Sequence, residues 1–178
     1  MSPSRLNDPE VERRLRDETI IWLITVAADG TPVPSPVAFY WDGSSFIVYS
    51  YANVPRVRNI RHRPLVSLHL NSTPTGDGVV VLSGVAVIDL SLPPAHEHPG
   101  YAAKHREGIE RKGGPEFSRR YRVPIRITPV DLRRSGDKGW TFTDLSGMRP
   151  VRTRAKWTAP EDRIPIASEP GPTQPSAD

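Results

Sequence analysis

The sequence predicts a mainly β fold, an antiparallel barrel of six to seven strands with a few short covering helices. Two strong hairpin signals, Asp29-Gly30 and Asp42-Gly43, separate three apolar segments near the N-terminus. Such short turns have no room for the crossovers that parallel strands need, so the sheet is chiefly antiparallel. With 178 residues, the chain can bury one good core but is too short for two typical domains.

The first part of the chain combines two helix starts with three strand segments. Asp8 and Pro9 place a capping residue before a proline at the first helical position. Pro55 suits the first turn of a second helix, in which Val57 and Ile60 are three residues apart. The segments between these starts are rich in β-branched and aromatic residues. The expected elements are a helix at 9–17, strands at 19–27, 30–41 and 45–51, and a helix at 53–63.

The second part of the chain also combines expected strands with expected helices, and it ends in a polar segment. Tyr101, His105 and Ile109 recur at i, i+4 and i+8, which predicts an amphipathic helix. The chain turns polar and proline-rich from about Asp144, a composition typical of disorder. The expected elements are strands at 64–70 and 78–90, helices at 93–111 and 115–121, and strands at 121–132 and 139–143. We expect a barrel domain over 1–143 and a C-terminal extension over 144–178 that is at least partly disordered.

The strand at 78–90 is apolar on both faces. In a small β domain, such a strand usually has the barrel interior on one side and a helix or a second subunit on the other. This pattern favours a homodimer.

The strand at 30–41 contains prolines at alternate positions, Pro32, Pro34 and Pro36. Alternate residues of a strand present their amides to the same edge, so these prolines remove the donors from one edge only. The strand can pair normally along the edge that keeps its amides, but it cannot form a normal hydrogen-bond ladder along the edge with the prolines. Two explanations stay open: an edge protected from aggregation, or a gap in the barrel wall where backbone groups face a ligand.

A basic segment lies beyond the third strand. Pro55 puts Arg56 close to a helix start, where free amides and the helix dipole favour a phosphate. The planar fork of arginine suits phosphate oxygens, and Ser50 and Tyr51 would add hydroxyl donors. The alternative is a solvated charged face, which is the usual fate of a charge run. The basic residues of the segment are Arg56, Arg58, Arg61, His62 and Arg63.

Composition excludes several classes of protein. The absence of cysteine excludes disulfides, thiolate metal sites and a cysteine nucleophile. The chain has no apolar run of membrane-spanning length and a charged N-terminus unlike a signal peptide, so we expect a cytoplasmic protein with no membrane partner. The net charge of +4 favours an anionic partner without requiring one. The arginine segment lacks the features of nucleic-acid binders, so we expect no nucleic-acid partner.

No catalytic residue and no metal site can be named from the sequence. Tyr40, Tyr49, Tyr51 and His69 are each able to donate a proton, but in strands they are more often packing groups. His96 and His98 lack helical i, i+4 spacing and nearby cysteines, which favours a solvated loop over a metal site.

Taken together, these residues resemble the flavin-binding split β-barrel family that includes the pyridoxamine 5′-phosphate oxidase-like proteins. Within it, the chain is most similar to the actinobacterial branch that uses the deazaflavin coenzyme F-420. The resemblance covers about residues 19–132 and rests, in order, on DGTPVPSPVAFYWDG, FIVYSYANVPRVRNIRHRPLVSLHL, VVVLSGVAVI, YAAKHREGIE and YRVPIRITPVDL. Its most specific part is RVRNIRHRP at 56–64, similar to the family's Lys-x-Arg-Asn-Leu segment.

This resemblance implies a split β-barrel of Greek-key type and a homodimer with the cofactor at the subunit interface. In the family, the cofactor ring lies against the second strand and its phosphate is held after the third. Arg56 stands where lysine is commoner, which changes the donor geometry. The cofactor-binding residues implied here are Ser35, Pro36 and Val37 at the ring, Ser50 and Tyr51 at the ribityl chain, and Arg56, Val57, Arg58 and Asn59 at the phosphate.

The resemblance implies an oxidoreductase that transfers a hydride between a bound cofactor and a small organic substrate. Coenzyme F-420 is favoured as the cofactor, and FMN is the alternative. Such a cofactor carries the reactive chemistry, so a catalytic triad is not expected. The alternative function is a non-catalytic protein of the same fold that binds or carries a flavin, a deazaflavin or haem.

Overall fold

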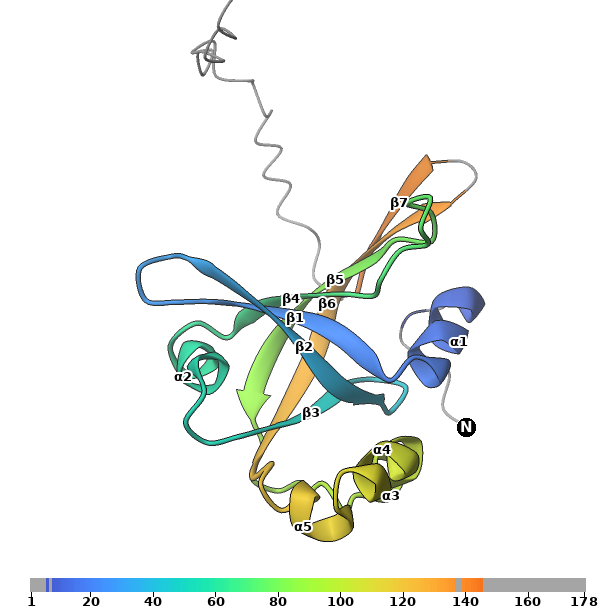
Figure 1. Ribbon diagram of the computed structural model, residues 1–178. Helices are drawn as coiled ribbons and strands as arrows, with labels where there is room; N and C mark the ends of the chain where they lie inside the picture. The colour runs from blue at the N-terminus through green and yellow to red at the C-terminus, as the bar shows by residue number, and fades with distance from the viewer. Residues whose placement is uncertain (1–5, 7, 137–138, 146–178) are drawn as a thin grey trace, which may run out of the picture.

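The computed structural model describes residues 6, 8–136 and 139–145 (Figure 1). Its strands are β1 (Ile20–Val26), β2 (Pro32–Trp41), β3 (Phe46–Ser50), β4 (Leu65–His69), β5 (Val80–Ile88), β6 (Val123–Gly136) and β7 (Gly139–Asp144). Its helices are α1 (Pro9–Asp17), α2 (Pro55–His62), α3 (Pro99–Lys104), α4 (Arg106–Arg111) and α5 (Gly114–Ser118). The predicted extension beyond 145 lies outside the described residues.

Six antiparallel strands close into a barrel, as predicted. The sheet order is β3-β2-β1-β4-β5-β6-β7, and an additional β3–β6 pairing closes the ring. Three strands joined by hairpins are followed by a fourth that returns beside the first, which is the Greek-key connection. Strand β7 pairs only with β6, so this hairpin extends from the closed barrel (Figure 1).

The barrel interior is filled by one apolar cluster. Phe39 and Phe46 are fully buried within it, with ring centroids 6.0 Å apart. The long connection from β3 to β4 contains α2, which buries Val57 and Ile60 in the same cluster. The N-terminal helix α1 adds Leu15, and its start is capped as the sequence predicted, because the Asp8 carboxylate accepts the amides of Glu10 and Val11. The core therefore fixes α2 at the end of β3.

The predicted helix at 93–111 is wrong as one continuous element. The structure has two six-residue helices, α3 and α4, which begin at Pro99 and break at His105. The ring of His105 points back to the barrel, and its Nε2 donates to the Phe39 carbonyl at 2.9 Å. Tyr101 of α3 is buried, whereas α4 buries no residue, so the predicted amphipathic period holds in α3 alone.

Strand β2 pairs as the alternating prolines require. Residues Pro32–Ala38 pair with β1, whereas only Phe39–Trp41 pair with β3. Along the proline half of the strand, β2 and β3 have separated, and no strand of the described chain pairs with the edge that lacks donors. The sequence prediction of one-sided pairing is confirmed.

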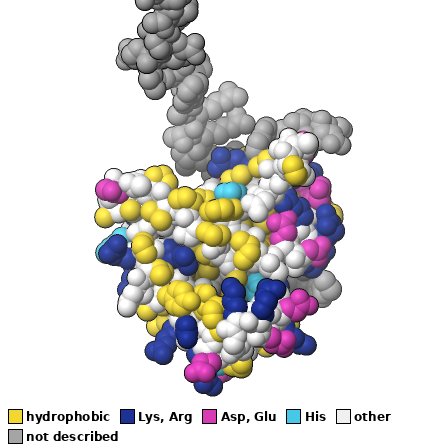
Figure 2. All heavy atoms as spheres, in the orientation of Figure 1, with side chains coloured by type: hydrophobic (Ala, Val, Ile, Leu, Met, Phe, Trp, Pro, Cys, Tyr) yellow, Lys and Arg dark blue, Asp and Glu magenta, His cyan; other side chains and the backbone are white. Residues whose placement is uncertain are grey.

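The outside of the barrel carries an extensive apolar surface across β2, β1, β4 and β5, here called the outer sheet face. Leu65 and Val85 are cross-strand neighbours on it and are 66% and 36% exposed. Figure 2 shows hydrophobic side chains gathered on the side of the molecule where β1 and β2 lie in Figure 1. The face comprises Pro34, Pro36, Ala38, Ile20, Trp22, Ile24, Leu65, His69, Val81, Val85 and Val87. Strand β5 is thus apolar on both faces, and no described helix covers its outer side.

Among the described residues, no helix is both long enough and apolar enough to cross a membrane.

Candidate functional site

A cleft of about 850 Å³ lies between the barrel and the helical layer α3–α5. The barrel contributes Pro36, Val37 and Ala38 from β2, with Tyr49 from β3 beside them. The cleft therefore opens at the point where β2 and β3 separate. Because Pro36 has no amide hydrogen, its backbone presents a carbonyl acceptor and no donor on this wall.

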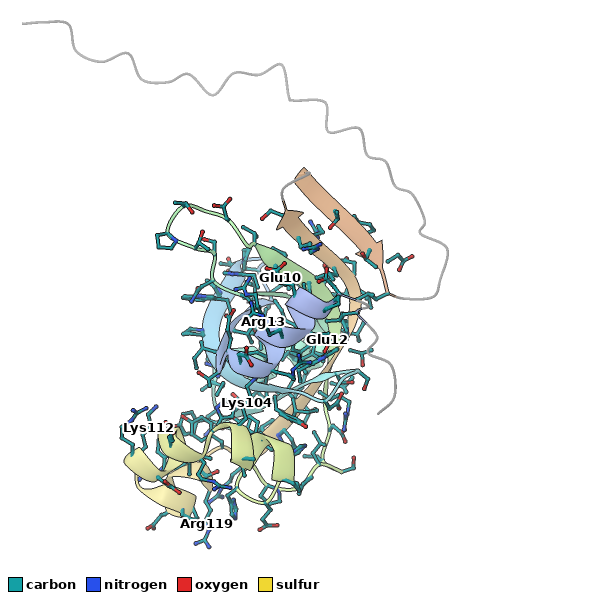
Figure 3. All side chains as sticks on the ribbon, turned by 90° about the vertical axis from the view of Figure 1, so that its right-hand side faces the viewer. Glu10, Glu12, Arg13, Lys104, Lys112 and Arg119 are labelled. Carbon is teal, nitrogen blue, oxygen red and sulfur yellow. The ribbon has the colours of Figure 1, made fainter. Side chains whose placement is uncertain are left out.

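The opposite wall is held against the barrel at fixed points. A Cβ atom on Gly100 would lie 2.2 Å from the Tyr40 ring, so any larger residue at this position would require the Tyr40 side chain to move. The Lys104 Nζ donates to the Leu15 carbonyl at the end of α1 at 2.7 Å and lies 3.8 Å from the centroid of the Phe39 ring. Figure 3 shows Lys104 between α1 and the helical layer.

Aromatic packing ties this layer to β3. Tyr49 and Tyr101 meet edge to face with their centroids 4.8 Å apart, and the Tyr49 hydroxyl donates to the Pro93 carbonyl at 2.6 Å. Burial raises the pKa of Tyr49 to about 12. Tyr49 is therefore a packing residue that stays protonated at neutral pH, as the sequence favoured. His69 stacks on Trp22 on the outer sheet face and is not in the cleft.

Arg56 lies at one end of the cleft, in the first turn of α2. Its Nη1 donates to the Ser50 Oγ at 3.2 Å, and burial lowers the pKa of its guanidinium. The residue before α2 is Val54, whose side chain does not cap the helix. Pro55 has no amide hydrogen and the Val57 amide donates to the Val54 carbonyl at 3.2 Å, so the Arg56 amide is the one left without a partner among the described residues of this turn. A cation, a hydroxyl and a helix start together form a suitable site for a phosphate group.

Two tyrosines complete this end of the cleft. The rings of Tyr51 and Tyr121 stack with centroids 4.5 Å apart. Burial, followed by a hydrogen bond with Tyr51, raises the pKa of Tyr121 to about 12. The Phe117 ring continues the series, 5.3 Å from Tyr121. The resulting aromatic wall leads from Arg56 along α5.

The structure brings together part of the predicted cofactor-binding set. Ser50 is fully buried and reaches the cleft through its bond with Arg56. The predicted residues that line the cleft are Pro36, Val37, Tyr51 and Arg56. Those outside its lining are Ser35, which is partly exposed on β2, Arg58, which is exposed, and Val57 and Asn59, whose side chains are buried. The side chain of Val57 belongs to the core.

Asn59 has a structural role, because its Nδ2 donates to the buried Thr25 Oγ1 at 3.0 Å and links α2 to β1. We expect Asn59→Ala to lower the free energy of unfolding by about 1–3 kcal/mol, since it leaves the buried Thr25 hydroxyl without this partner. Urea unfolding checks this, with the exposed Arg58→Ala as a control that changes little. Unchanged stability together with weaker cofactor binding would instead place Asn59 in the anion site.

Lys104 offers a test of the helical layer by pH. Burial lowers its pKa from 10.5 to about 8 in the folded protein. Between these values the unfolded chain holds the proton and the folded protein has released it, so this group makes unfolding less favourable as the pH rises. We expect the stability of the wild type relative to Lys104→Met to increase from pH 8 to 10 in urea unfolding. A difference that is independent of pH would contradict the lowered pKa.

The outer arginines of the basic segment differ from one another. Arg63 donates to the carbonyls of Ala27 and Ala28 at 2.5 and 2.8 Å and so braces the β1–β2 turn. Arg61 is exposed on α2. The basic segment is therefore neither a uniform charged face nor a single anion site.

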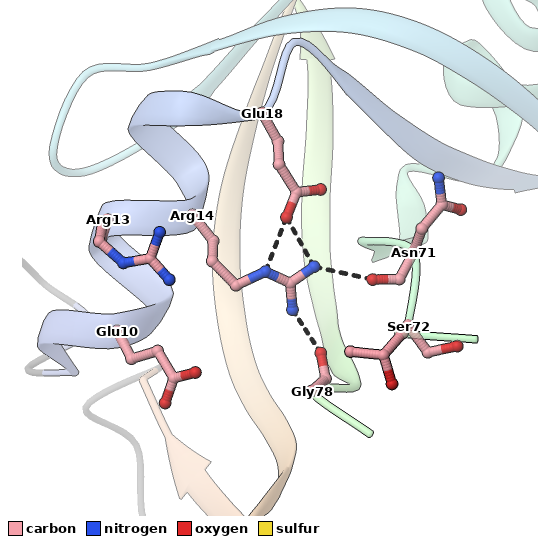
Figure 4. A pocket seen from close by; sticks show the side chains of 8 residues that line it. Glu10, Arg13, Arg14, Glu18, Asn71, Ser72 and Gly78 are labelled. Carbon is pink, nitrogen blue, oxygen red and sulfur yellow. Dashed lines mark hydrogen bonds and ion pairs between the residues drawn. The ribbon is translucent and has the colours of Figure 1, made fainter. Parts of the chain in front are cut away.

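A second, smaller hollow lies under α1 (Figure 4). Its central cation is Arg14, which donates to the Gly78 carbonyl, to the Asn71 carbonyl at 2.7 Å and to Glu18 at 2.6 Å. Because these donors are all used within the protein, Arg14 anchors α1 to the β4–β5 loop.

The loop histidines do not form a metal site among the described residues. The His98 Nδ1 accepts the Tyr101 amide at 3.2 Å and caps α3, and the His96 Nε2 lies 3.3 Å from a Glu97 oxygen. The capping role was missed in the sequence, although the histidine directly before Pro99 was a signal for it.

The sequence interpretation also missed the opposite wall as a source of site residues. Tyr121, Phe117, Lys104 and Arg106 line the cleft, but they lie far along the chain from the proline strand. Their helical spacing predicts only which of them share a face, and the barrel decides what that face meets.

The comparisons with known proteins agree with this architecture. The model of the pyridoxamine 5′-phosphate oxidase family matches residues 8–112. A search of curated proteins found no significant match.

Three solved structures illustrate the range of proteins with this fold. An F-420 reductase is 21% identical over 68% of this chain and 94% of that chain, with a TM-score of 0.57. A putative pyridoxamine 5′-phosphate oxidase from Listeria innocua is 18% identical over 70% and 94%, with a TM-score of 0.54. A haem-binding protein from Mycobacterium smegmatis is 19% identical over 78% and 59%, with a TM-score of 0.55. At these identities, the likeness shows the fold alone.

Proposed function

Because this chain belongs to the pyridoxamine 5′-phosphate oxidase family, we propose that its cleft binds a phosphorylated flavin-type cofactor and that the protein is an oxidoreductase. Coenzyme F-420 is the favoured cofactor, with FMN as the alternative. The observation that carries the proposal is the position of Arg56: its guanidinium, the Ser50 hydroxyl and the uncapped start of α2 lie at one end of the same cleft as the unpaired edge of β2. A planar ring on the strand and a phosphate at the helix fit this arrangement.

The residues present fit such a cofactor in the following way. Arg56, through its guanidinium and its backbone amide, would hold the phosphate, and Pro36 and Val37 would provide the backbone strip against the ring. The bound cofactor would supply hydride transfer. The chain itself positions the ring, and the stacked Tyr51 and Tyr121 border that end of the cleft. Tyr49 is fully engaged with Pro93, so we assign it no proton transfer.

The second candidate function is a non-catalytic carrier of flavin, deazaflavin or haem. A solved structure titled as a haem-binding protein shares the fold, which supports this alternative. Of the histidines that the structure describes, only His105 lines the cleft, and its Nε2 donates to the Phe39 carbonyl. Because this nitrogen already donates to a carbonyl, it is not available to bind haem iron, which favours a flavin-type cofactor in the cleft.

Purification and turnover distinguish these functions. The absorption spectrum of the purified protein identifies flavin, deazaflavin or haem by colour. We expect a flavin or deazaflavin spectrum, and the bound cofactor, once reduced, should be reoxidised by a suitable organic acceptor. A haem spectrum with no binding of FMN or coenzyme F-420 would reject the proposal.

We also propose that the protein is a homodimer formed through the outer sheet face. Four large apolar residues on this face are at least 36% exposed in the single chain, Ile20, Leu65, Val85 and Val87. Apolar patches of this kind on one sheet face mark interaction sites. Ile20, Pro36 and Ala38 lie both on this face and in the lining of the cleft, so a second subunit on the face would border the cofactor.

A further inference from the structure

The cleft carries more positive charge than one phosphate group requires. Within the part of the chain that the structure describes, five lysine or arginine side chains line it, against a single glutamate. Arg56 is at the α2 end, whereas the other four come from the helical layer across the cleft. These four are Lys104, Arg106, Arg111 and Lys112.

The four cations of the helical layer are not equally available. Lys104 is committed to the Leu15 carbonyl, and the Lys112 Nζ lies 5.3 Å from the centroid of the Phe117 ring. Arg106 and Arg111 make no side-chain hydrogen bond or ion pair with any residue in the described part of the chain. Their guanidinium donors are therefore free to bind a ligand in the cleft.

Both arginines are exposed to solvent, and both have potential partners on their own helix that they do not use. Glu110 is four residues after Arg106, and Arg111 is four residues after Glu107, a spacing that normally favours ion pairs. Neither pair is within ion-pair distance in the described chain. Like charges gathered without neutralising partners create a field that attracts an anion.

The wall that carries these arginines is firmly placed. Lys104 and His105, directly before Arg106, are bonded to α1 and to β2. Phe117 and Tyr121 flank the same part of the cleft with aromatic surface. The cations are thus presented beside planar apolar groups on a wall that is anchored to the barrel.

From this arrangement we propose that Arg106 and Arg111 form a second anion subsite, which binds the carboxylate of a planar, conjugated acid as the substrate. The inference rests on the proposed function, because it gives Arg56 to the cofactor phosphate. A carboxylate is matched by the guanidinium fork, and the aromatic wall suits a flat hydrocarbon body.

The experiment compares benzoate with its neutral analogue benzamide. Each is titrated into the protein loaded with FMN, and separately with coenzyme F-420, while the absorption of the cofactor is followed. We expect wild type to bind benzoate at least about tenfold more tightly than benzamide, the scale of one charge-assisted hydrogen bond. The double variant R106Q/R111Q should lose this preference and keep its affinity for FMN.

The matched control is R13Q/R16Q, which removes the same charge from the exposed side of α1, outside the cleft. It should retain the preference for benzoate. Equal binding of benzoate and benzamide by wild type, or an unchanged preference in R106Q/R111Q, would overturn the proposal. Weaker binding of coenzyme F-420 but not of FMN, with no preference for benzoate, would overturn it by assigning the arginines to the acidic tail of the cofactor.

Different results reject the anion subsite and the proposed function. If wild type binds neither FMN nor coenzyme F-420, the proposed function is rejected. The benzoate and benzamide titrations are therefore repeated on cofactor-free protein by calorimetry. In cofactor-free protein, loss of the preference for benzoate in R106Q/R111Q supports the anion subsite, and an unchanged preference overturns the subsite.

Discussion

Replacing Arg56 with alanine is expected to weaken the binding of FMN and coenzyme F-420 by on the order of tenfold to a hundredfold. A charge-assisted contact to phosphate contributes roughly 1.5–3 kcal/mol, which corresponds to this range. The fold should survive, because Arg56 is only partly buried and the one hydrogen bond of its side chain within the described residues is to Ser50. Fluorescence titration of the cofactor measures the affinity, and the melting temperature verifies the fold.

The control for this variant is Arg61→Ala, on the same helix and exposed to solvent. It should have little effect on FMN, whose charge is compact. With coenzyme F-420, whose acidic tail extends beyond the phosphate, Arg61 should contribute and the dependence on salt should be steeper. Negligible losses for Arg56→Ala with both cofactors would remove this segment as the phosphate site, and the proline strand would then be interpreted as a protected edge.

Replacing Val87 with aspartate is expected to convert a stable dimer into a monomer and to reduce cofactor affinity by about tenfold or more. Val87 is 48% exposed on the outer sheet face, and a buried, unpaired carboxylate is strongly unfavourable at an interface. The cofactor effect follows if the second subunit borders the cleft. Sedimentation at micromolar concentration gives the assembly state, and the same fluorescence titration gives the affinity.

Phe142→Asp provides the matched control, since Phe142 is 62% exposed but lies on β7, outside the outer sheet face. It should leave both the assembly and the affinity unchanged. A wild-type protein that sediments only as a monomer would contradict the dimer directly. A monomeric Val87→Asp variant with full cofactor affinity would instead show that the cleft is complete within one subunit.

The sequence by itself determined the elements that depend on local chemistry. The two Asp-Gly turns set the first three strands, and Asp8 with Pro9 set the start of α1. Alternating prolines determined that β2 pairs on one edge only, because an amide without hydrogen cannot donate wherever the strand lies. The family motif placed Arg56 at a helix start beside Ser50, and the structure has them in contact.

Only the tertiary structure decided what these elements face. Asn59 and Arg58 stand side by side in the same motif, yet Asn59 points to Thr25 and Arg58 points to solvent, because the core buries one side of α2. The helix breaks at His105, whose ring is bonded to the Phe39 carbonyl, 66 residues away in sequence. Periodicity records which residues share a helix face, but the partner of that face is set by contacts between distant segments. For this reason the sequence did not predict the arginines of the helical layer as site residues, and only the folded structure shows that they line the cleft.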